Sequence, residues 1–388
     1  MMKEKEEKRV PQLRFPEFTD DWEQRKVFDV APLQRGFDLP STDIKNGKYP
    51  VVMSNGIGAY HSEYKAEGPG VVTGRSGTIG KLHYIKEKYW PHNTTLWVTN
   101  FKGNNPKFIY YMFQCLDLSR FGTGSGVPTL NRNDVHDDVV SIPSGSEQIM
   151  ISEYLTTLDH LITLHQRKLE KLKKLKKGLV QKLFSQKVRF KADDGSEFPE
   201  WEEKKLGELG TFIKGAALSK ADISEYGSPF ILYGELYTTY KEVAYNIQRR
   251  TQAIVDKKYY SCIGDVVIPT SGESAEEIST ATCVMVPNVI LGGDLNIFRS
   301  DIVDGRIMSY ILNHQVKWKI AMIAQGKSIV HIQAKQLSNI YVKYPVSKVE
   351  QQKIADCLSL LDDVIEKQKV TLAAWEEMKK GLLQQMFV

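Results

Sequence analysis

Apolar residues recur at alternating four- and three-residue steps in two long stretches of the chain, over residues 151–183 and 354–386. Steps that average about 3.5 residues keep side chains on one face of a helix and are typical of a coiled-coil seam. The sequence therefore predicts two long helices, over residues 144–184 and 347–387, that pack against each other.

The second stretch is a copy of the first. Ser144 and Glu147 recur as Ser347 and Glu350, at one offset of 203 residues. Ser-x-x-Glu is the pattern of a capping box, in which the two side chains satisfy backbone N–H groups at a helix start. Polar residues interrupt the two apolar series at matching places, which are His165 with Gln368 and Lys176 with Lys379. The duplication predicts internal two-fold symmetry, a geometry suited to a two-fold partner such as duplex DNA.

The segments before the helices predict short strands separated by turns rich in Gly, Asn and Asp. The strand candidates are YPVVMSNG, GVVTG, GKLHYI and TTLWV in the first copy, and PFILYG, DVVIPTSG, TATCVMV and NIFRS in the second. Each copy also has one helix candidate, over residues 107–118 and 306–324. We therefore expect an α+β fold that occurs twice.

The repeat is cyclic, because the polar link over residues 186–200 resembles the leader over residues 5–17. The offset between the copies grows from 179 in the leader to 203 in the helix (Trp22 to Trp201, Ser144 to Ser347). The second globular part is therefore 24 residues longer. We expect the domains to be 1–143 (the leader and globular domain 1), 144–185 (the central helix), 186–346 (the linker and globular domain 2) and 347–388 (the C-terminal helix); the globular domains are called recognition domains 1 and 2 once their role has been argued.

Composition adds two expectations. No apolar stretch approaches the roughly 20 residues that cross a bilayer, so we expect a cytoplasmic protein without membrane contact. The formal charge of +5 is modest, but residues 167–187 carry nine Lys or Arg and only one acidic residue. Such a face is either solvated or directed at phosphate or a partner protein.

Motifs for catalysis are weak. Residues 321–328 match a phosphate-loop pattern formally, but a helical pattern precedes them and an alternating one follows, which is the wrong context. Pro199-Glu200 with Glu203-x-Lys205 resembles a nuclease motif, yet copy one has Arg25 at the lysine position. No Asn-Pro-Pro-Tyr or Asp-Pro-Pro-Tyr tetrapeptide of amino-methyltransferases is present. We expect no catalytic residue and no metal ligand in this chain.

Loops rich in Gly, Ser, Thr, Asn, Arg and Lys occupy matching places in the two copies. Arg can pair with guanine, and Asn or Gln with adenine, so we predict DNA contacts here. Ordinary turn chemistry is the favoured explanation of each residue taken singly, and only the paired arrangement of the loops favours DNA contacts. The candidates in copy one are Asn55, Arg75, Ser76, Thr78, Lys81, Thr123, Ser125, Asn131, Arg132 and Asn133. Those in copy two are Thr270, Ser271, Ser274, Lys327, Ser328, His331 and Gln333.

The chain as a whole resembles the DNA specificity (S) subunit of type I restriction-modification systems. The resemblance rests on the leader LRFPEF, the stretch GTGSGVP at residues 122–128 and the twice-repeated join of a proline to Glu-Gln that opens each helix. In copy two the corresponding loop lacks the glycine-rich form. The resemblance implies two target-recognition domains joined by antiparallel helices, each domain reading one half of a bipartite asymmetric DNA site.

The resemblance also implies partners. The helices would dock two methyltransferase subunits, and restriction subunits would add to that core. S-adenosylmethionine, ATP and magnesium are then expected on the partner subunits, and no cofactor on this chain. A helix over residues 147–184 is about 57 Å long at roughly 1.5 Å per residue, which is enough to set the distance between two readers.

Three residues outside the apolar seam of the first helix recur in the second, although helix pairing needs only the seam. They are Lys177, Gly178 and Gln181, which recur as Lys380, Gly381 and Gln384. We predict that they bind the partner subunits, while common ancestry of the copies explains them equally well. Two other functions stay open, which are a coiled-coil scaffold without DNA readout and a stand-alone nuclease or NTPase.

Overall fold

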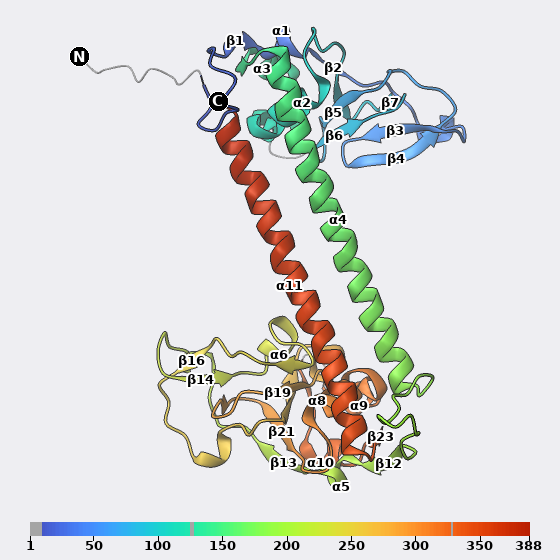
Figure 1. Ribbon diagram of the computed structural model, residues 1–388, viewed down its shortest axis with the longest axis vertical. Coiled ribbons are helices and arrows are strands. Elements are labelled where there is room, and N and C mark those ends of the chain that lie inside the picture. The colour runs from blue at the N-terminus through green and yellow to red at the C-terminus, as the bar shows by residue number, and fades with distance from the viewer. Residues whose placement is uncertain (1–9, 125–127, 327–328) are drawn as a thin grey trace, which may run out of the picture. The chain divides into compact units, whose positions relative to one another are not determined.

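The computed structural model describes residues 10–124, 128–326 and 329–388 (Figure 1). The chain forms two compact units. Unit 1 comprises the chain up to Arg167 together with Val370–Val388, and unit 2 comprises Lys168–Lys369. Each unit contains helices and sheets, so the predicted α+β class and its repetition are confirmed. In the described part of the chain no helix is long and apolar enough to cross a membrane.

Unit 1 contains a four-stranded antiparallel sheet, β2-β8-β5-β6, and a three-stranded sheet, β4-β3-β7. The strands cover the four segments predicted in copy one. Their bounds are β2 Leu33–Arg35, β3 Tyr49–Met53, β4 Gly56–His61, β5 Gly70–Gly74, β6 Leu82–Ile85, β7 Trp90–Pro91 and β8 Thr95–Val98. The other elements are β1 Glu23–Lys26, α1 Val27–Val30, α2 Pro106–Leu116, β9 Gly122–Thr123, β10 Thr129–Leu130, α3 Arg132–Asp137 and β11 Val139–Ile142.

Unit 2 repeats this plan with one more strand, in a five-stranded sheet β13-β21-β17-β19-β15 and a three-stranded sheet β16-β14-β20. The strands are β12 Glu202–Lys205, β13 Thr211–Lys214, β14 Ser228–Ile231, β15 Val243–Ala244, β16 Arg250–Thr251, β17 Asp265–Pro269, β18 Ser271–Gly272, β19 Thr282–Val284, β20 Ile290–Leu291, β21 Leu295–Arg299, β22 Val330–His331 and β23 Tyr341–Tyr344. The short helices are α5 Leu206–Leu209, α6 Glu235–Thr238, α7 Ala275–Ile278 and α10 Ala334–Ser338.

The helix predicted over residues 306–324 is interrupted. It consists of α8 Gly305–Tyr310, a π-helical turn η5 Ile311–Gln315 and α9 Lys317–Ile323. The side-chain amide of Asn313 donates to the Ser309 carbonyl and to the Ala281 carbonyl, and its oxygen accepts from the Ala281 N–H at 3.0 Å. A side chain that competes for backbone groups in this way favours a π-bulge over a regular helix.

The long helices are α4 Gly145–Phe184 and α11 Lys348–Met386, as predicted. Within each unit they lie side by side and run in opposite directions (Figure 1). Gln166 donates to Glu376 in unit 1, and Lys176 pairs with Asp362 in unit 2. Apolar seam residues such as Leu155 and Leu358 are fully buried. A supercoil along the whole pair stays a prediction.

The helix ends show the cyclic character of the repeat. In unit 1 the Phe387 ring at the end of α11 stacks on Phe108, with ring centroids 5.4 Å apart. In unit 2 the matching Phe184 at the end of α4 stacks on Tyr310 at 6.2 Å. Each globular part is therefore clamped between the start of its own helix and the end of the other.

Only one of the two interactions of each expected capping box forms, which is the one made by the serine. The Glu147 N–H donates to Ser144 Oγ at 3.4 Å, but the Glu147 carboxylate accepts from the leader, at 2.7 Å from Arg14 Nε and 3.3 Å from Trp22 Nε1. Glu147 is fully buried, so a cation and an indole N–H are better partners than a helix-end amide that water can also satisfy.

Unit 2 repeats this anchor. Glu350 is fully buried and accepts from Arg189 Nε at 3.2 Å and from Trp201 Nε1 at 3.1 Å. Arg189 belongs to the polar link over residues 186–200 and is partly exposed, and its side chain ties this link to the start of α11.

Candidate nucleic-acid interface

In unit 1 the structure brings the predicted DNA-binding residues together where β5 ends. The Leu130 N–H donates to the Arg75 carbonyl at 2.7 Å, and Ser76 pairs with Thr129 in an isolated β-bridge. These bonds place Asn131 beside Arg75, although 56 residues separate them in sequence (75 to 131). Sequence order alone gives no sign of this contact.

A loop over residues 74–81 adds further candidates to the same edge. The Gly74 N–H donates to the Lys81 carbonyl at 3.0 Å, and Lys81 Nζ donates to the Asn55 carbonyl at 2.9 Å. Thr78 at the tip is exposed. Asn55, Thr78 and Lys81 therefore lie on one loop surface, next to Arg75 and Ser76.

Unit 2 builds the same edge from other residues. The Ile332 N–H donates to the Thr270 carbonyl at 3.0 Å, in the place of the Leu130–Arg75 bond. Ser271 pairs with His331, and Ser271 Oγ lies 3.1 Å from His331 Nδ1. Gln333 follows directly and is exposed. The two units thus share a backbone arrangement whose side chains differ.

Several candidates also have the ordinary role that their residue types predict. Asn131 caps α3 by accepting from the Asn133 N–H, and Ser274 caps α7 by accepting from the Glu277 N–H. The Gln333 N–H at the start of α10 donates to Gln336 Oε1 at 2.8 Å. Thr123 Oγ1 donates to the Thr129 carbonyl.

The side chains of Asn131, Arg132 and Asn133 are exposed, so they are open to a ligand. Three candidates, Ser125, Lys327 and Ser328, lie outside the described residues. Base contacts by any of these residues stay a prediction.

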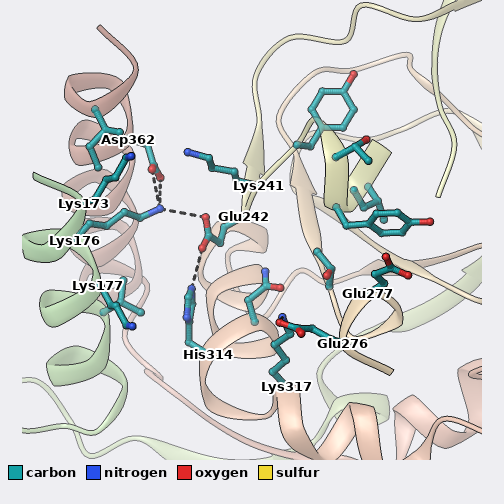
Figure 2. Close-up of a pocket in the computed structure, with 18 of the residues that line it drawn as sticks. Lys173, Lys176, Lys177, Lys241, Glu242, Glu276, Glu277, His314, Lys317 and Asp362 are labelled. Carbon is teal, nitrogen blue, oxygen red and sulfur yellow. Dashed lines mark hydrogen bonds and ion pairs between the residues drawn. The ribbon is translucent and has the colours of Figure 1, made fainter. Parts of the chain in front are cut away.

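Four of the six residues predicted to bind partner proteins line two clefts. In unit 2 a cleft of about 860 Å³ is lined by Lys177 and Gln181 on α4 (Figure 2). In unit 1 a cleft of about 650 Å³ is lined by their counterparts Lys380 and Gln384 on α11. Each cleft lies between the end of a long helix and a recognition domain. The two clefts are therefore lined by helix residues that correspond in the repeat.

The two recurring glycines face open space. A Cβ added at Gly178 or at Gly381 would meet no described atom of this chain within 4 Å. Close approach inside the chain therefore does not explain the glycines. Three residues before each one lies an exposed apolar side chain, Leu175 with 57% and Met378 with 49% exposure.

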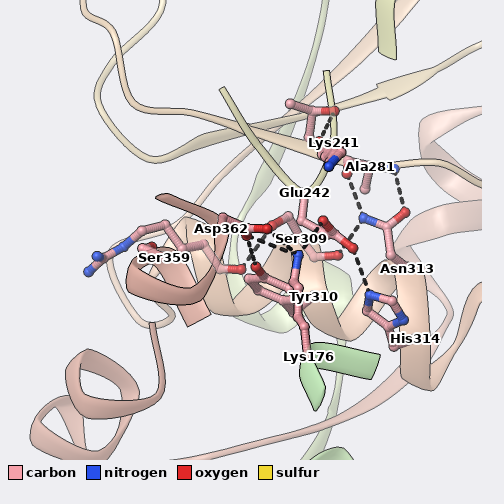
Figure 3. A network of polar contacts seen from close by, with 12 residues as sticks. Lys176, Lys241, Glu242, Ala281, Ser309, Tyr310, Asn313, His314, Ser359 and Asp362 are labelled. Carbon is pink, nitrogen blue, oxygen red and sulfur yellow. Dashed lines mark hydrogen bonds and ion pairs between the residues drawn. The ribbon is translucent and has the colours of Figure 1, made fainter. Parts of the chain in front are cut away.

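A polar triad on the helices escaped the sequence analysis. In unit 1, Asp159 pairs with Lys379 Nζ at 2.6 Å and accepts from the Tyr111 hydroxyl at 2.7 Å. In unit 2, Asp362 pairs with Lys176 Nζ at 2.7 Å and accepts from the Tyr310 hydroxyl at 2.7 Å (Figure 3). The recurrence of Lys176 as Lys379 and of Asp159 as Asp362 was the available signal.

The tyrosines of the triads have little access to water. Burial is the main cause that raises the pKa of Tyr111 and of Tyr310 far above the ordinary value, and the neighbouring aspartate adds to the shift. Both hydroxyls therefore stay protonated and act as hydrogen-bond donors to the aspartates. The triads are structural anchors that hold each recognition domain on the helices.

The family model of the type I restriction modification DNA specificity domain matches the chain twice, over residues 19–174 and 199–373. The type I restriction enzyme MjaVIII specificity subunit of Methanocaldococcus jannaschii is 25% identical over 278 residues, which cover 67% of this chain and 64% of that protein. The MjaIX specificity subunit of the same organism is 22% identical and covers 90% of this chain and 89% of its own length.

Solved structures show the same fold. A type I restriction-modification system S subunit from M. genitalium has a TM-score of 0.68 at 16% identity, with 98% of this chain and 99% of that chain covered. A second structure comes from work on complex assembly and conformational transition of the type I R-M system. It has a TM-score of 0.53 at 15% identity, and the match covers 94% of this chain and 97% of that one. The double family match covers most of the chain and shows that it belongs to the family of type I restriction modification DNA specificity domains.

Proposed function

We propose that the chain reads a bipartite asymmetric DNA site, with one half-site for each recognition domain. The proposal rests on an edge that occurs in both units with the same backbone hydrogen bonds and different side chains. This reading edge consists of residues 74–81 and 129–133 in unit 1 and of residues 270–271 and 331–333 in unit 2. Arg75 and Asn131 stand in unit 1 where Thr270 and Gln333 stand in unit 2. Equal backbones with unequal side chains are what two readers of different sequences require.

The side chains suit base readout. A guanidinium such as that of Arg75 can donate two hydrogen bonds to guanine, and the amide of an Asn or Gln can pair with adenine in the major groove. Hydroxyl groups and lysines nearby, such as Thr78 and Lys81, suit phosphate contacts that fix the register. Helix lysines over residues 167–187 add a basic surface in unit 2.

The second part of the proposal concerns partners. The chain itself carries out no catalysis; it places two methyltransferase subunits on the DNA, and restriction subunits join that assembly. S-adenosylmethionine, ATP and magnesium bind to those partners. The two equivalent clefts and the two exposed pairs, Leu175 with Gly178 and Met378 with Gly381, support two identical docking places.

The recognition role is tested by mapping methylated adenines genome-wide in cells with and without the gene. We expect one asymmetric motif of two fixed parts, separated by a fixed spacer, to lose methylation when the gene is removed. An unchanged methylation pattern would favour the scaffold without DNA readout. DNA cleavage or nucleotide hydrolysis by the isolated chain would instead favour the stand-alone enzyme.

The docking role is tested with the double variant Gly178→Leu and Gly381→Leu. Both positions have room for a side chain, so the chain should fold, while a bulky residue blocks the close approach of a partner helix. We expect the methyltransferase subunits to be lost in co-purification. Gly145→Leu, which also faces open space, is the matched control. Retention of both partners by the double variant would place the docking surface elsewhere.

A further inference from the structure

Unit 2 contains an inserted segment that unit 1 lacks. From Ile231 in β14 to Val266 in β17 the chain advances 35 residues, whereas the matching step from Val52 in β3 to Val71 in β5 is 19 residues. The extra chain contains β15, which pairs in parallel with β19. It therefore supplies the fifth strand of a sheet that has four strands in unit 1.

Both ends of β15 contact the long helices. Glu242, just before the strand, pairs with Lys176 Nζ of α4 at 3.1 Å. Tyr245, just after the strand, donates its hydroxyl to Ser359 Oγ of α11 at 2.8 Å. The inserted segment thus contacts α4 through Glu242 (Figure 3) and α11 through Tyr245.

Glu242 extends the triad described above. Asp362, Lys176 and Tyr310 repeat the arrangement of Asp159, Lys379 and Tyr111, and the glutamate is an added fourth member. Its second oxygen lies 2.9 Å from His314 Nε2 of η5. The residue in the place of His314 in unit 1, four positions after the triad tyrosine, is Cys115, whose thiol donates to the Leu383 carbonyl.

The electrostatics favour a charged and fixed carboxylate. Burial by itself would raise the pKa of Glu242, but the hydrogen bond with His314 and the charge of Lys176 outweigh it and hold the pKa at about 2. The side chain is only 16% exposed. A buried carboxylate with two polar partners has little orientational freedom. If it moved away from either partner, it would be left buried without that interaction, which costs free energy.

We propose that Glu242 and Tyr245 form a brace that fixes the orientation of recognition domain 2 on the helices, and thereby the spacing at which its half-site is read. This inference rests on the proposed function. Unit 1 folds its matching four-stranded sheet and triad without a brace, so the shared scaffold does not need one. The contacts also join the domain to the helices and are not part of its apolar core.

The test uses the chain with its methyltransferase subunits and duplexes whose spacer is native, one base pair shorter or one longer. The variants are Glu242→Gln, which keeps the shape but removes the charge, and Tyr245→Phe, which removes one hydroxyl from a half-exposed ring. We expect the preference for the native spacer in methylation to fall by about fivefold or more in the double variant. Glu276→Gln is the control, because Glu276 lines the same cleft with a side chain that is 86% exposed (Figure 2).

Each outcome decides the matter. A reduced spacer preference, with methylation of the native-spacer duplex retained and the variant still folded at the assay temperature, supports the brace. An unchanged spacer preference in the double variant overturns it. Equal loss on every duplex together with a lower melting temperature would assign the pair a purely structural role and also overturn it. If the unaltered complex shows no bipartite site, the proposed function fails, which is a separate result from failure of the brace.

Discussion

The two units hold their recognition domains on the helices with the same contacts, yet they present different residues to a ligand. Arg14, Trp22 and Glu147 in unit 1 correspond to Arg189, Trp201 and Glu350 in unit 2. The reading edges share only their backbone bonds, and unit 2 adds the brace. The two copies therefore share their anchors and differ in their surfaces, as the proposed reading of two different half-sites requires.

The largest effects should come from the shared anchor, and they should be equal in the two units. Glu147→Ala and Glu350→Ala each leave a partly buried arginine and a buried indole N–H without their carboxylate, and each should lower the free energy of unfolding by about 3–5 kcal/mol. Urea unfolding followed by tryptophan fluorescence measures this loss. Glu153→Ala, on the exposed face of α4, is the control. A clear inequality between the two variants would break the equivalence of the units.

The stability that Glu242 contributes should depend on pH, and this residue has no counterpart in unit 1. The pKa of Glu242 in the folded chain is about 2, against 4.5 ordinarily. Its stabilisation is therefore present above pH 4.5 and is lost as the pH falls toward 2. The shift corresponds to about 3 kcal/mol. We expect the stability difference between the native chain and Glu242→Gln to shrink over that range; a difference that persisted at pH 2 would contradict the assigned ionisation.

Loss of a base contact should affect binding at one half-site only, with a smaller change in free energy. Arg75→Ala should cost about 1–3 kcal/mol in binding at one half-site only, if the guanidinium pairs with a base. Competition binding with duplexes altered in one half at a time measures this. Lys86→Ala, at the other end of β6, is the control. An equal loss on every sequence would show that Arg75 contacts phosphate.

The smallest effect should again be equal in the two units. Gly178→Ala and Gly381→Ala place a methyl group in open space within a helix, so each should stabilise the isolated chain by about 0.5–1 kcal/mol. Thermal unfolding measures the gain. Destabilisation by either alanine would reveal a contact of that helix position within the chain.

The long helices were predictable because they depend on local sequence patterns. The apolar spacing over residues 151–183 and the serine at each helix start are short-range signals, and α4 and α11 follow them closely. The break in the helix after Tyr310 was not predictable, since it depends on a bond between Asn313 and Ala281, 32 residues apart. Side-chain partners across such separations are set by packing.

The sequence supplies candidate residues for DNA contacts, which stay a prediction, but it does not show how the chain brings them together. The chemistry of Arg75 and Asn131 makes them candidates, but their proximity depends on the hydrogen bond from the Leu130 N–H to the Arg75 carbonyl. Glu242 could not be found from the repeat, because it has no counterpart in copy one. Lys176 carried a signal in its recurrence as Lys379, and only the fold shows that its partners are Asp362 and Glu242.

The central claim is that each recognition domain reads one half-site independently of the other. It is tested most directly by replacing residues 186–346 with the corresponding domain of a relative and mapping the methylated adenines in cells. The account predicts a new motif that keeps the half-site read by domain 1 and changes the other half. A motif altered in both halves, or in neither, would contradict it.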